Sequence, residues 1–397
     1  MKLIERHEYI KEIKGVLNTP DIKVVTGIRR AGKSKLMEEI IKHIKTNDTS
    51  ANIIHINFNL SKFENIQEYK LLENYIESHY DKNKTNYIFV DEIQMCENFE
   101  KAINSLHAKE KFDIYVSGSN AFLQSSDLAT LFVGRTYEVH VYPFSFNEYL
   151  KYYPSNNQYI SFDDYIINGG MSGSYLYKTQ DQKYKYINEE VFNSLIVRDI
   201  INKYKVRNKQ VMDLLIDFLM DNIGNLTTLR SVEESLKAKG FKIDHKTVGK
   251  YIDYLCKAFA FYKVRRYDVR GKRYLNSEEK YYLADHSFRY ARLGTKNMDY
   301  GHVLENIIAI ELLRRDYELY VGKLYENKID FVAIKQGKKT YIQVSYDISD
   351  NKTLNRELEP LLKIKDAYPK ILIARTHQPE YQIEGIKIID PADWLMH

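Results

Sequence analysis

The feature that most constrains this chain is a short glycine-containing segment between an apolar stretch and an amphipathic one. Residues 27–34 read Gly-Ile-Arg-Arg-Ala-Gly-Lys-Ser, which fits the phosphate-binding loop pattern G-x-x-x-x-G-K-[ST]. The apolar stretch before it ends at Val25 and is typical of a buried strand, while Leu36 and Ile40 continue after it as one face of a helix. A strand, a glycine loop and a helix in this order predict a nucleotide-binding α/β domain.

Each residue type in this loop has a chemical reason to be there. Gly27 and Gly32 allow the backbone to curl, so that its N–H groups point inward at phosphate oxygens. Lys33 adds a positive charge for the β- and γ-phosphates, and the Ser34 hydroxyl can ligate Mg²⁺. A glycine turn that fits the pattern by chance is the alternative, and the flanking strand and helix argue against it. We therefore expect ATP with Mg²⁺ to be bound by Gly27, Ile28, Arg29, Arg30, Ala31, Gly32, Lys33, Ser34 and Lys35.

Two acidic residues follow a second apolar run. Residues 87–94 read Tyr-Ile-Phe-Val-Asp-Glu-Ile-Gln, a predicted strand that ends in Asp91 and Glu92. In P-loop enzymes a carboxylate at the tip of such a strand holds Mg²⁺, which is the role expected for Asp91. Glu92 would then be the general base that polarises the attacking water. The alternative is that both acids only begin a loop, and the phosphate loop upstream favours the catalytic role.

A further strand is predicted over residues 112–117, followed by small polar residues. Asn120, or Ser119 beside it, could reach the γ-phosphate or its water from the tip of this strand; otherwise these residues cap a helix. Arg135 is a candidate phosphate contact, either in its own subunit or in a neighbour's. The alternative for Arg135 is a solvated surface arginine.

These segments together resemble the bacterial and archaeal AAA-type predicted ATPases that carry a C-terminal domain of unknown function. The matching segments are 26–34, 90–94, 117–120, 134–135 and 143–149. The last of these reads Pro-Phe-Ser-Phe-Asn-Glu-Tyr and has Phe144 where the family has leucine. After Gly169-Gly170 the chain has Met171-Ser172 where the family usually has a proline. The resemblance implies ATP binding with Mg²⁺ and an AAA-type sheet, and it continues less sharply to the C-terminus.

Composition narrows the class of protein further. A length of 397 residues predicts two or three domains. The net charge of +5 and the pI of about 8.7 permit nucleic-acid binding without requiring it. Cys96 and Cys256 lie far apart and in no metal-ligand spacing, which argues against zinc and disulfides and suits a reducing compartment. With no apolar signal core and no long uncharged apolar run, we expect a cytoplasmic protein with no membrane partner.

The middle of the chain has the order of a winged helix. Residues 151–205 are predicted to form a helical lid or linker, and residues 206–290 follow with three helices and a two-stranded hairpin. Basic residues on the third helix and the hairpin would contact the phosphates of double-stranded DNA, and these are Lys246, Lys250, Arg265, Arg266, Arg270, Lys272 and Arg273. The alternative is an interdomain packing module whose hairpin tip is charged in the ordinary way.

The last part of the chain resembles the PD-(D/E)xK restriction-nuclease-like core. Glu305 and Asp330 match its first two acidic positions, while Gln343 and Ser345 stand where Glu-x-Lys is expected. Gln343 can offer an oxygen to a metal ion, but Ser345 cannot supply the positive charge of the lysine. Lys328 is a candidate replacement for that lysine. We expect a degenerate site that does not cleave DNA.

The sequence therefore predicts an α/β chain of four parts. These are a P-loop AAA-type parallel-sheet ATPase domain (1–150), a helical lid (151–205), a winged-helix domain (206–290) and a small restriction-endonuclease-like α/β domain (295–397). The expected function is Mg²⁺-dependent ATP hydrolysis that controls the later domains, with double-stranded DNA, a second copy of the chain or another protein as partners. Two alternatives remain open, an ATP-gated nuclease and a non-catalytic nucleotide switch or scaffold.

Overall fold

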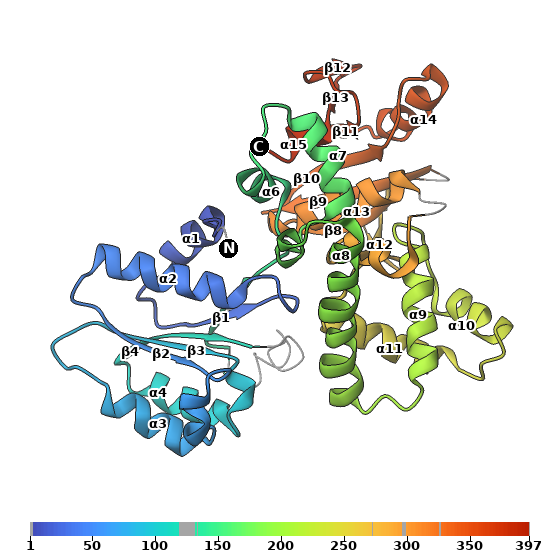
Figure 1. Ribbon diagram of the computed structural model, residues 1–397. Helices are drawn as coiled ribbons and strands as arrows, with labels where there is room; N and C mark the ends of the chain where they lie inside the picture. The colour runs from blue at the N-terminus through green and yellow to red at the C-terminus, as the bar shows by residue number, and fades with distance from the viewer. Residues whose placement is uncertain are drawn as a thin grey trace. The chain divides into compact units, whose positions relative to one another are not determined.

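The chain divides into two compact units, Met1–Tyr142 and Pro143–His397. A computed structural model describes residues 3–118, 132, 134–271, 273–295, 299–324 and 327–396 (Figure 1). Within these ranges no helix combines the length and the apolar character that a membrane crossing needs.

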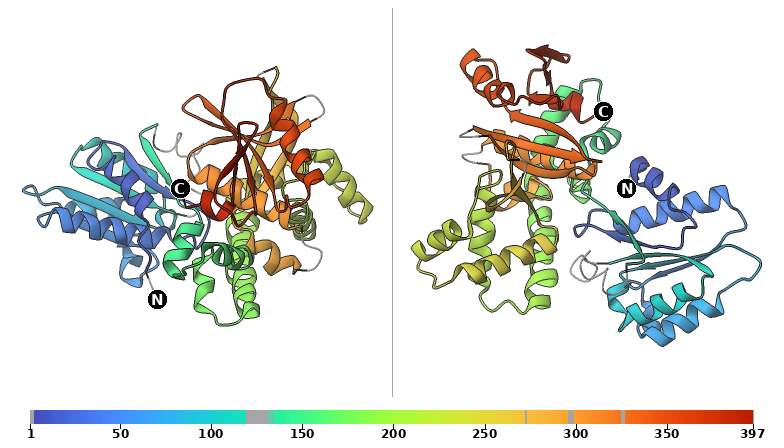
Figure 2. Two further views of the ribbon diagram at one scale, coloured as in Figure 1. Left: turned by 90° about the horizontal axis from the view of Figure 1, so that it is seen from above. Right: turned by 180° about the vertical axis from the view of Figure 1, so that it is seen from behind.

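Unit 1 is built on a parallel five-stranded sheet with the strand order β2-β3-β4-β1-β5. Its strands are β1 (Ile22–Thr26), β2 (Asn52–Asn57), β3 (Asn86–Asp91), β4 (Phe112–Ser117) and β5 (Thr136–His140). Its helices are α1 (His7–Lys14), α2 (Lys33–Asn47), α3 (Tyr69–Ser78) and α4 (Phe99–Ala108), with the short 3-10 helices η1 (Ser61–Ile66) and η2 (Ile93–Met95). Helices α1 and α2 cover one face of the sheet, and α3 and α4 cover the other (Figures 1 and 2). The predicted α/β parallel sheet is therefore confirmed.

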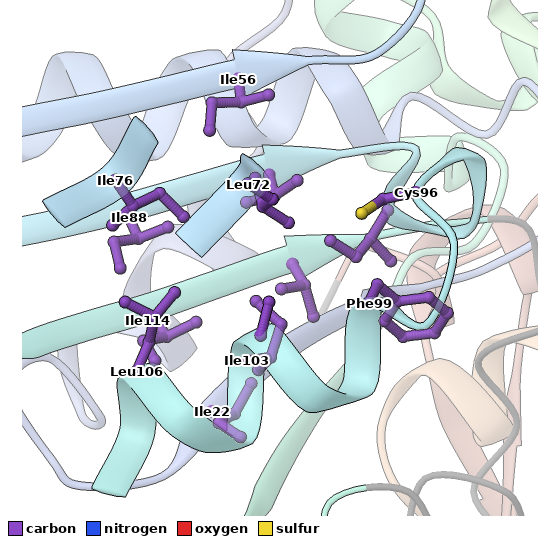
Figure 3. Close-up of a cluster of buried hydrophobic side chains, with 14 of the residues drawn as sticks. Ile22, Ile56, Leu72, Ile76, Ile88, Cys96, Phe99, Ile103, Leu106 and Ile114 are labelled. Carbon is purple, nitrogen blue, oxygen red and sulfur yellow. The ribbon is translucent and has the colours of Figure 1, made fainter. Parts of the chain in front are cut away.

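One core cluster of unit 1 lies between the sheet and helices α3 and α4. The three inner strands β1, β3 and β4 are buried along nearly their whole length, as expected inside a parallel sheet, whereas the edge strands β2 and β5 are only partly buried. Ile88 and Ile114 from neighbouring strands pack with Leu72 of α3 and Ile103 of α4, and all four side chains are at most 2% exposed (Figure 3). Packing of this kind holds the strand ends that follow in fixed positions.

Unit 2 begins with helices. These are α6 (Phe146–Tyr152), α7 (Gln158–Asn168), α8 (Gln180–Lys185), α9 (Lys209–Asp221), α10 (Leu229–Ala238), α11 (His245–Lys257) and α12 (Ser287–Leu293), with the 3-10 helix η3 (Ser172–Leu176) and the π-helices η4 (Tyr186–Asn193) and η5 (Ile196–Asn202). Asp244 caps α11, since its carboxylate accepts from the Thr247 N–H. The order α9, α10, α11 and then a hairpin follows the predicted order of helices and strands.

The hairpin continues into a larger sheet than predicted. Strands β6 (Phe261–Asp268) and β7 (Arg273–Leu283) are antiparallel partners, and β6 also pairs in parallel with β8 through residues 265–268. The resulting eight-stranded sheet has the order β12-β13-β11-β10-β9-β8-β6-β7. The boundary predicted between residues 290 and 295 therefore falls between strands of one sheet.

The rest of unit 2 completes this sheet. Its strands are β8 (Glu318–Leu324), β9 (Asn327–Lys335), β10 (Lys338–Ser345), β11 (Lys370–Ala374), β12 (Tyr381–Ile383) and β13 (Ile386–Ile389), and its helices are α13 (Tyr300–Arg314), α14 (Asn351–Leu362) and α15 (Pro391–Trp394). Strands β8, β9 and β10 are antiparallel neighbours, and β10 pairs in parallel with β11 after the α14 crossover. This places α13, β9 and β10 where their side chains can meet.

Candidate functional site

The predicted phosphate loop has the tight backbone that its glycines allow. Gly27 has φ of +131°, and a Cβ added there would lie 2.1 Å from the Val141 carbonyl oxygen. Gly32 has φ of +101° and precedes the first residue of α2. Positive φ is accessible to glycine at little cost, and no side chain fits at Gly27. The loop thus follows β1 and leads directly into the N-terminus of a 15-residue helix, where free backbone N–H groups favour an anion.

Lys33 is buried at the start of α2, with 7% of its surface exposed. Its ammonium group donates to the carbonyl oxygens of Gly27 at 2.8 Å and Ile28 at 3.2 Å. These acceptors are neutral and belong to the loop itself, so the lysine lies folded over the loop. Ser34, the next residue, is half-buried.

The expected carboxylate lies at the same edge of the sheet. Asp91 ends β3 with 1% of its surface exposed, and it accepts hydrogen bonds from the Ser117 hydroxyl at the end of β4 and from the Asn57 amide at 3.1 Å. Ser117 is the register partner of Val25, two residues before the loop. Because the carboxyl ends of parallel strands lie together, Asp91 and the phosphate loop are both found at the carboxyl ends of the strands of this sheet.

Glu92 adopts a backbone conformation that is uncommon for its residue type. Its φ of +57° is left-handed, and its carboxylate accepts a hydrogen bond from the Gln94 side chain. Non-glycine residues in this region are enriched at functional positions, where the surrounding structure holds them. Glu92 is half-buried at this turn, whereas the preceding Asp91 is buried.

Sequence reasoning missed a polar cluster beside the loop. The Thr26 hydroxyl donates to Glu138 at 2.7 Å and lies 3.0 Å from Nδ1 of His140, both on β5. Burial first, and the nearby charge of Lys33 second, lower the pKa of His140 to about 3, while burial raises the pKa of Glu138. His140 is therefore neutral at physiological pH and adds no positive charge next to Lys33.

Arg6 is a second contact of the loop that the sequence did not point to. Its guanidinium is buried over the Tyr9 ring and donates to the carbonyl oxygens of Ala31 at 3.1 Å and Tyr142 at 2.9 Å. It thereby joins the N-terminal segment to the phosphate loop and to the last residue of unit 1. An arginine 21 positions before the first glycine of the loop carries no recognisable spacing signal.

One predicted residue is not brought to the loop, and another lies outside the described residues. Arg135 is exposed, and its carbonyl accepts from the Ile22 N–H at the start of β1, so it lies at the sheet edge opposite the loop. The prediction that Arg135 contacts phosphate in its own subunit is therefore wrong, because the residue precedes its strand instead of following it. Ser119 and Asn120 lie outside the described residues.

Unit 2 holds a second buried ionic cluster. Lys280 of β7 donates to Glu305 of α13 at 2.6 Å and lies 3.4 Å from a carboxylate oxygen of Asp330 on β9. The Tyr282 hydroxyl donates to the same Glu305 oxygen. Burial raises the pKa of Glu305 to about 7, although Lys280 acts in the opposite direction. Burial alone would lower the pKa of Lys280, but the two carboxylates together outweigh it and raise that pKa.

Gln343 joins this cluster through the backbone. Its side-chain oxygen accepts from the Asp330 N–H at 3.3 Å, and its amide donates to Glu357 at 2.8 Å. The structure thus brings Glu305, Asp330 and Gln343 together, as the sequence suggested. Lys328 is exposed, and the lysine of the cluster is Lys280, which belongs to the hairpin. Among the described residues no group of three histidine, cysteine, aspartate or glutamate side chains is arranged to hold a metal ion.

The basic residues considered for DNA contact divide into two sets. Lys246, Lys250, Arg265 and Arg270 are exposed. Arg266 is buried and ion-paired with Glu278, so it is not available at the surface as predicted. The reason is that β6 became an inner strand of the large sheet, and alternate residues of an inner strand are covered. Lys272 and the side chain of Arg273 lie outside the described residues.

Two family models match the chain. The model described as "AAA domain" matches residues 19–150, and the model described as "Domain of unknown function (DUF8612)" matches residues 159–299. The first contains the phosphate loop, Asp91 and Glu92. The second ends before Glu305.

Among curated proteins, an uncharacterized protein of Haemophilus influenzae is 34% identical over 99% of both chains. An uncharacterized protein of Methanocaldococcus jannaschii is 28% identical over 88% of this chain and 78% of its own length. Among solved structures, the Walker-type ATPase of Pyrococcus abyssi has a TM-score of 0.46 at 16% identity, covering 73% of this chain and 96% of its own. The chain therefore belongs to the family of the Haemophilus influenzae protein, and its first part is an AAA domain.

Proposed function

We propose that the chain is a Mg²⁺-dependent ATPase whose nucleotide site is the phosphate loop of unit 1. One observation carries the proposal: a buried lysine folded over the loop and a buried aspartate lie at one edge of the same parallel sheet. On nucleotide binding, Lys33 would exchange the carbonyl oxygens of Gly27 and Ile28 for phosphate oxygens. Each exchange replaces a neutral acceptor with a charged one, which strengthens the hydrogen bond.

The residues present fit a magnesium ion. Asp91 is ionisable, buried and held by a hydroxyl and an amide, which orient it without neutralising its charge. Ser34 and Asp91 would hold the ion, directly or through water, and the ion would neutralise charge on the phosphates. Glu92, positioned by Gln94, would accept a proton from the attacking water.

Steady-state release of phosphate tests this proposal. Wild-type protein should release phosphate from ATP with Mg²⁺ and stop when EDTA removes the metal. A parallel reaction with linear and plasmid DNA separates the alternatives: metal-dependent nicking would favour an ATP-gated nuclease, and tight ATP binding without turnover would favour a switch or scaffold. Absence of both binding and turnover would overturn the nucleotide site.

For unit 2 we propose a winged-helix and nuclease-like part that responds to the nucleotide state without cleaving DNA. The order α13, β8, β9, β10, α14 and β11 supports the nuclease-like interpretation, and Ser345 argues against cleavage. A second copy of the chain is a partner in this proposal, because Arg135 could reach only a neighbour's nucleotide.

Binding to double-stranded DNA is a second candidate function, supported by the exposed Lys246 and Lys250 on α11 and Arg270 at the hairpin turn. Replacing these three residues with alanine should weaken binding at low salt and reduce the slope of log K against log salt by roughly one unit per lost phosphate contact. The matched control is Arg230→Ala, which removes an exposed arginine ion-paired with Glu234 at 3.0 Å. Failure of wild-type protein to bind duplex at low salt would leave only the packing role.

A further inference from the structure

The nuclease-like order of elements suggests a site for a divalent cation between Glu305 and Asp330. The contacts of Lys280 show whether such an ion fits between them. In such a core the cation lies between the acid of the helix and the acid of the strand. Here the Lys280 ammonium lies in that place, 2.6 Å from Glu305 and 3.4 Å from Asp330. Lys280 is 6% exposed, so its ammonium contacts the two carboxylates directly and not through a layer of water.

Protein donors also bind other oxygens of the cluster. The second oxygen of Asp330 accepts from the Val344 N–H at 3.0 Å, and the side-chain oxygen of Gln343 accepts from the Asp330 N–H. The Tyr282 hydroxyl adds a further donor at Glu305. A hard cation needs several oxygens around it, and these hydrogen bonds engage the second Asp330 oxygen, the Gln343 oxygen and one oxygen of Glu305.

The helical part of the unit closes the site from another side. A Cβ added to Gly224, whose φ is +73°, would lie 3.1 Å from the second Glu305 oxygen. Gly224 donates its N–H to Tyr281 at 3.3 Å, and Thr227 exchanges backbone hydrogen bonds with Glu279. The loop between α9 and α10 is thus fastened to β7 directly over the carboxylate.

We propose that the Lys280 ammonium replaces the divalent cation of a nuclease-like core, which makes unit 2 metal-independent. The cation is a permanent part of the chain and comes from the hairpin, outside the α13–β11 core. It joins three elements, β7, α13 and β9, and leaves two carboxylates with one compensating charge. A divalent ion entering beside it would meet a positive charge within hydrogen-bond distance, and so would be repelled. The inference does not depend on nucleotide binding.

Chemical rescue tests the proposal in the full-length chain without nucleotide. Lys280→Met removes the ammonium and keeps most of the volume, leaving Glu305 and Asp330 without their shared cation. In EDTA, the melting temperature of Lys280→Met should be lower than that of wild type. Adding Mn²⁺ should restore it, and this recovery should be absent in the double variant Lys280→Met/Asp330→Asn. The matched control is Lys263→Met, which removes a lysine of the same hairpin that pairs with Glu279 at 3.6 Å. That variant should show no recovery with Mn²⁺.

A direct measurement decides the matter if Lys280→Met does not fold. Electron paramagnetic resonance of free Mn²⁺, titrated with wild-type protein and with Asp330→Asn, should give the same curve for both. Tighter binding by wild type than by Asp330→Asn would overturn the proposal, because the cluster would then hold a metal beside Lys280. A folded Lys280→Met that binds Mn²⁺ less than tenfold more tightly than wild type would also overturn it.

Discussion

Lys33 in unit 1 and Lys280 in unit 2 are similarly buried, at 7% and 6% exposed, and the hydrogen-bond acceptors described for each differ in charge. Lys33 donates to two backbone carbonyls of its own loop, and Lys280 lies between two carboxylates of distant elements. Carbonyls are neutral and can be exchanged for phosphate oxygens with a gain in electrostatic energy. A buried ion pair is costly to break, since either partner alone would be left as an uncompensated charge. The first lysine is therefore placed to bind a ligand, and the second is placed to hold the fold.

Replacing glutamate with glutamine in each of the two sites should change the rate of ATP hydrolysis very differently. Glu92→Gln keeps the shape of the side chain but loses the base, and should slow phosphate release by about 10²- to 10⁴-fold with ATP affinity retained. Glu305→Gln makes the same change in the second cluster and should leave hydrolysis nearly unchanged. Phosphate release at saturating ATP measures both. Equal rates in wild type and Glu92→Gln would reduce Glu92 to a loop acid.

Alanine substitutions at three glycines compare how closely the backbone is packed at the two sites. Gly27→Ala should cost roughly 2–4 kcal/mol of unfolding free energy, because its Cβ would overlap the Val141 backbone and its φ is positive. Gly224→Ala should cost less, since it meets only the Glu305 side chain at 3.1 Å. Gly134, with φ of +72° and open space around it, is the control for the backbone alone, at about 1–2 kcal/mol. Urea unfolding ranks them, and Gly27→Ala as mild as Gly134→Ala would contradict the close-packed loop.

Glu305 in the second cluster gives the stability of the chain a dependence on pH. The groups facing Glu305 are Lys280, Asp330 and Tyr282. Burial, together with the charge of Asp330, outweighs Lys280 and Tyr282 and raises the pKa of Glu305 from 4.5 to about 7. A raised pKa means that the folded chain holds a proton that the unfolded chain releases, so this stability is full below pH 4.5 and lost as the pH rises through 7. Wild type should therefore lose stability relative to Glu305→Gln over this range. A difference that stays constant with pH in thermal unfolding would show that Glu305 titrates normally.

The parts of the fold found from sequence are those encoded by local patterns. The phosphate loop and the acids at the end of β3 depend on short spacings beside apolar strands, and the structure places them at the ends of β1 and β3. The convergence of Glu305, Asp330 and Gln343 follows instead from the resemblance to a nuclease-like core.

The residues that sequence reasoning missed act across long separations. Lys280 meets acids 25 and 50 positions later, and Arg6 reaches the carbonyl of Tyr142, 136 positions away. No spacing rule encodes such pairs, because they arise only when the sheet is assembled. Arg135 and Arg266 were misplaced for a related reason: strand direction fixes the edge at which a residue lies, and the partners of a strand decide which of its side chains are covered.

Calorimetric titration with ATP and Mg²⁺ measures whether Lys33 exchanges the loop carbonyls for phosphate oxygens. Wild type should bind with one site per chain, and Lys33→Ala should bind at least about tenfold more weakly, as expected when a charged hydrogen bond is lost. Lys42→Ala, which removes an exposed lysine further along α2, should match wild type. Lys33→Ala that remains folded and binds ATP as tightly as wild type would contradict the account.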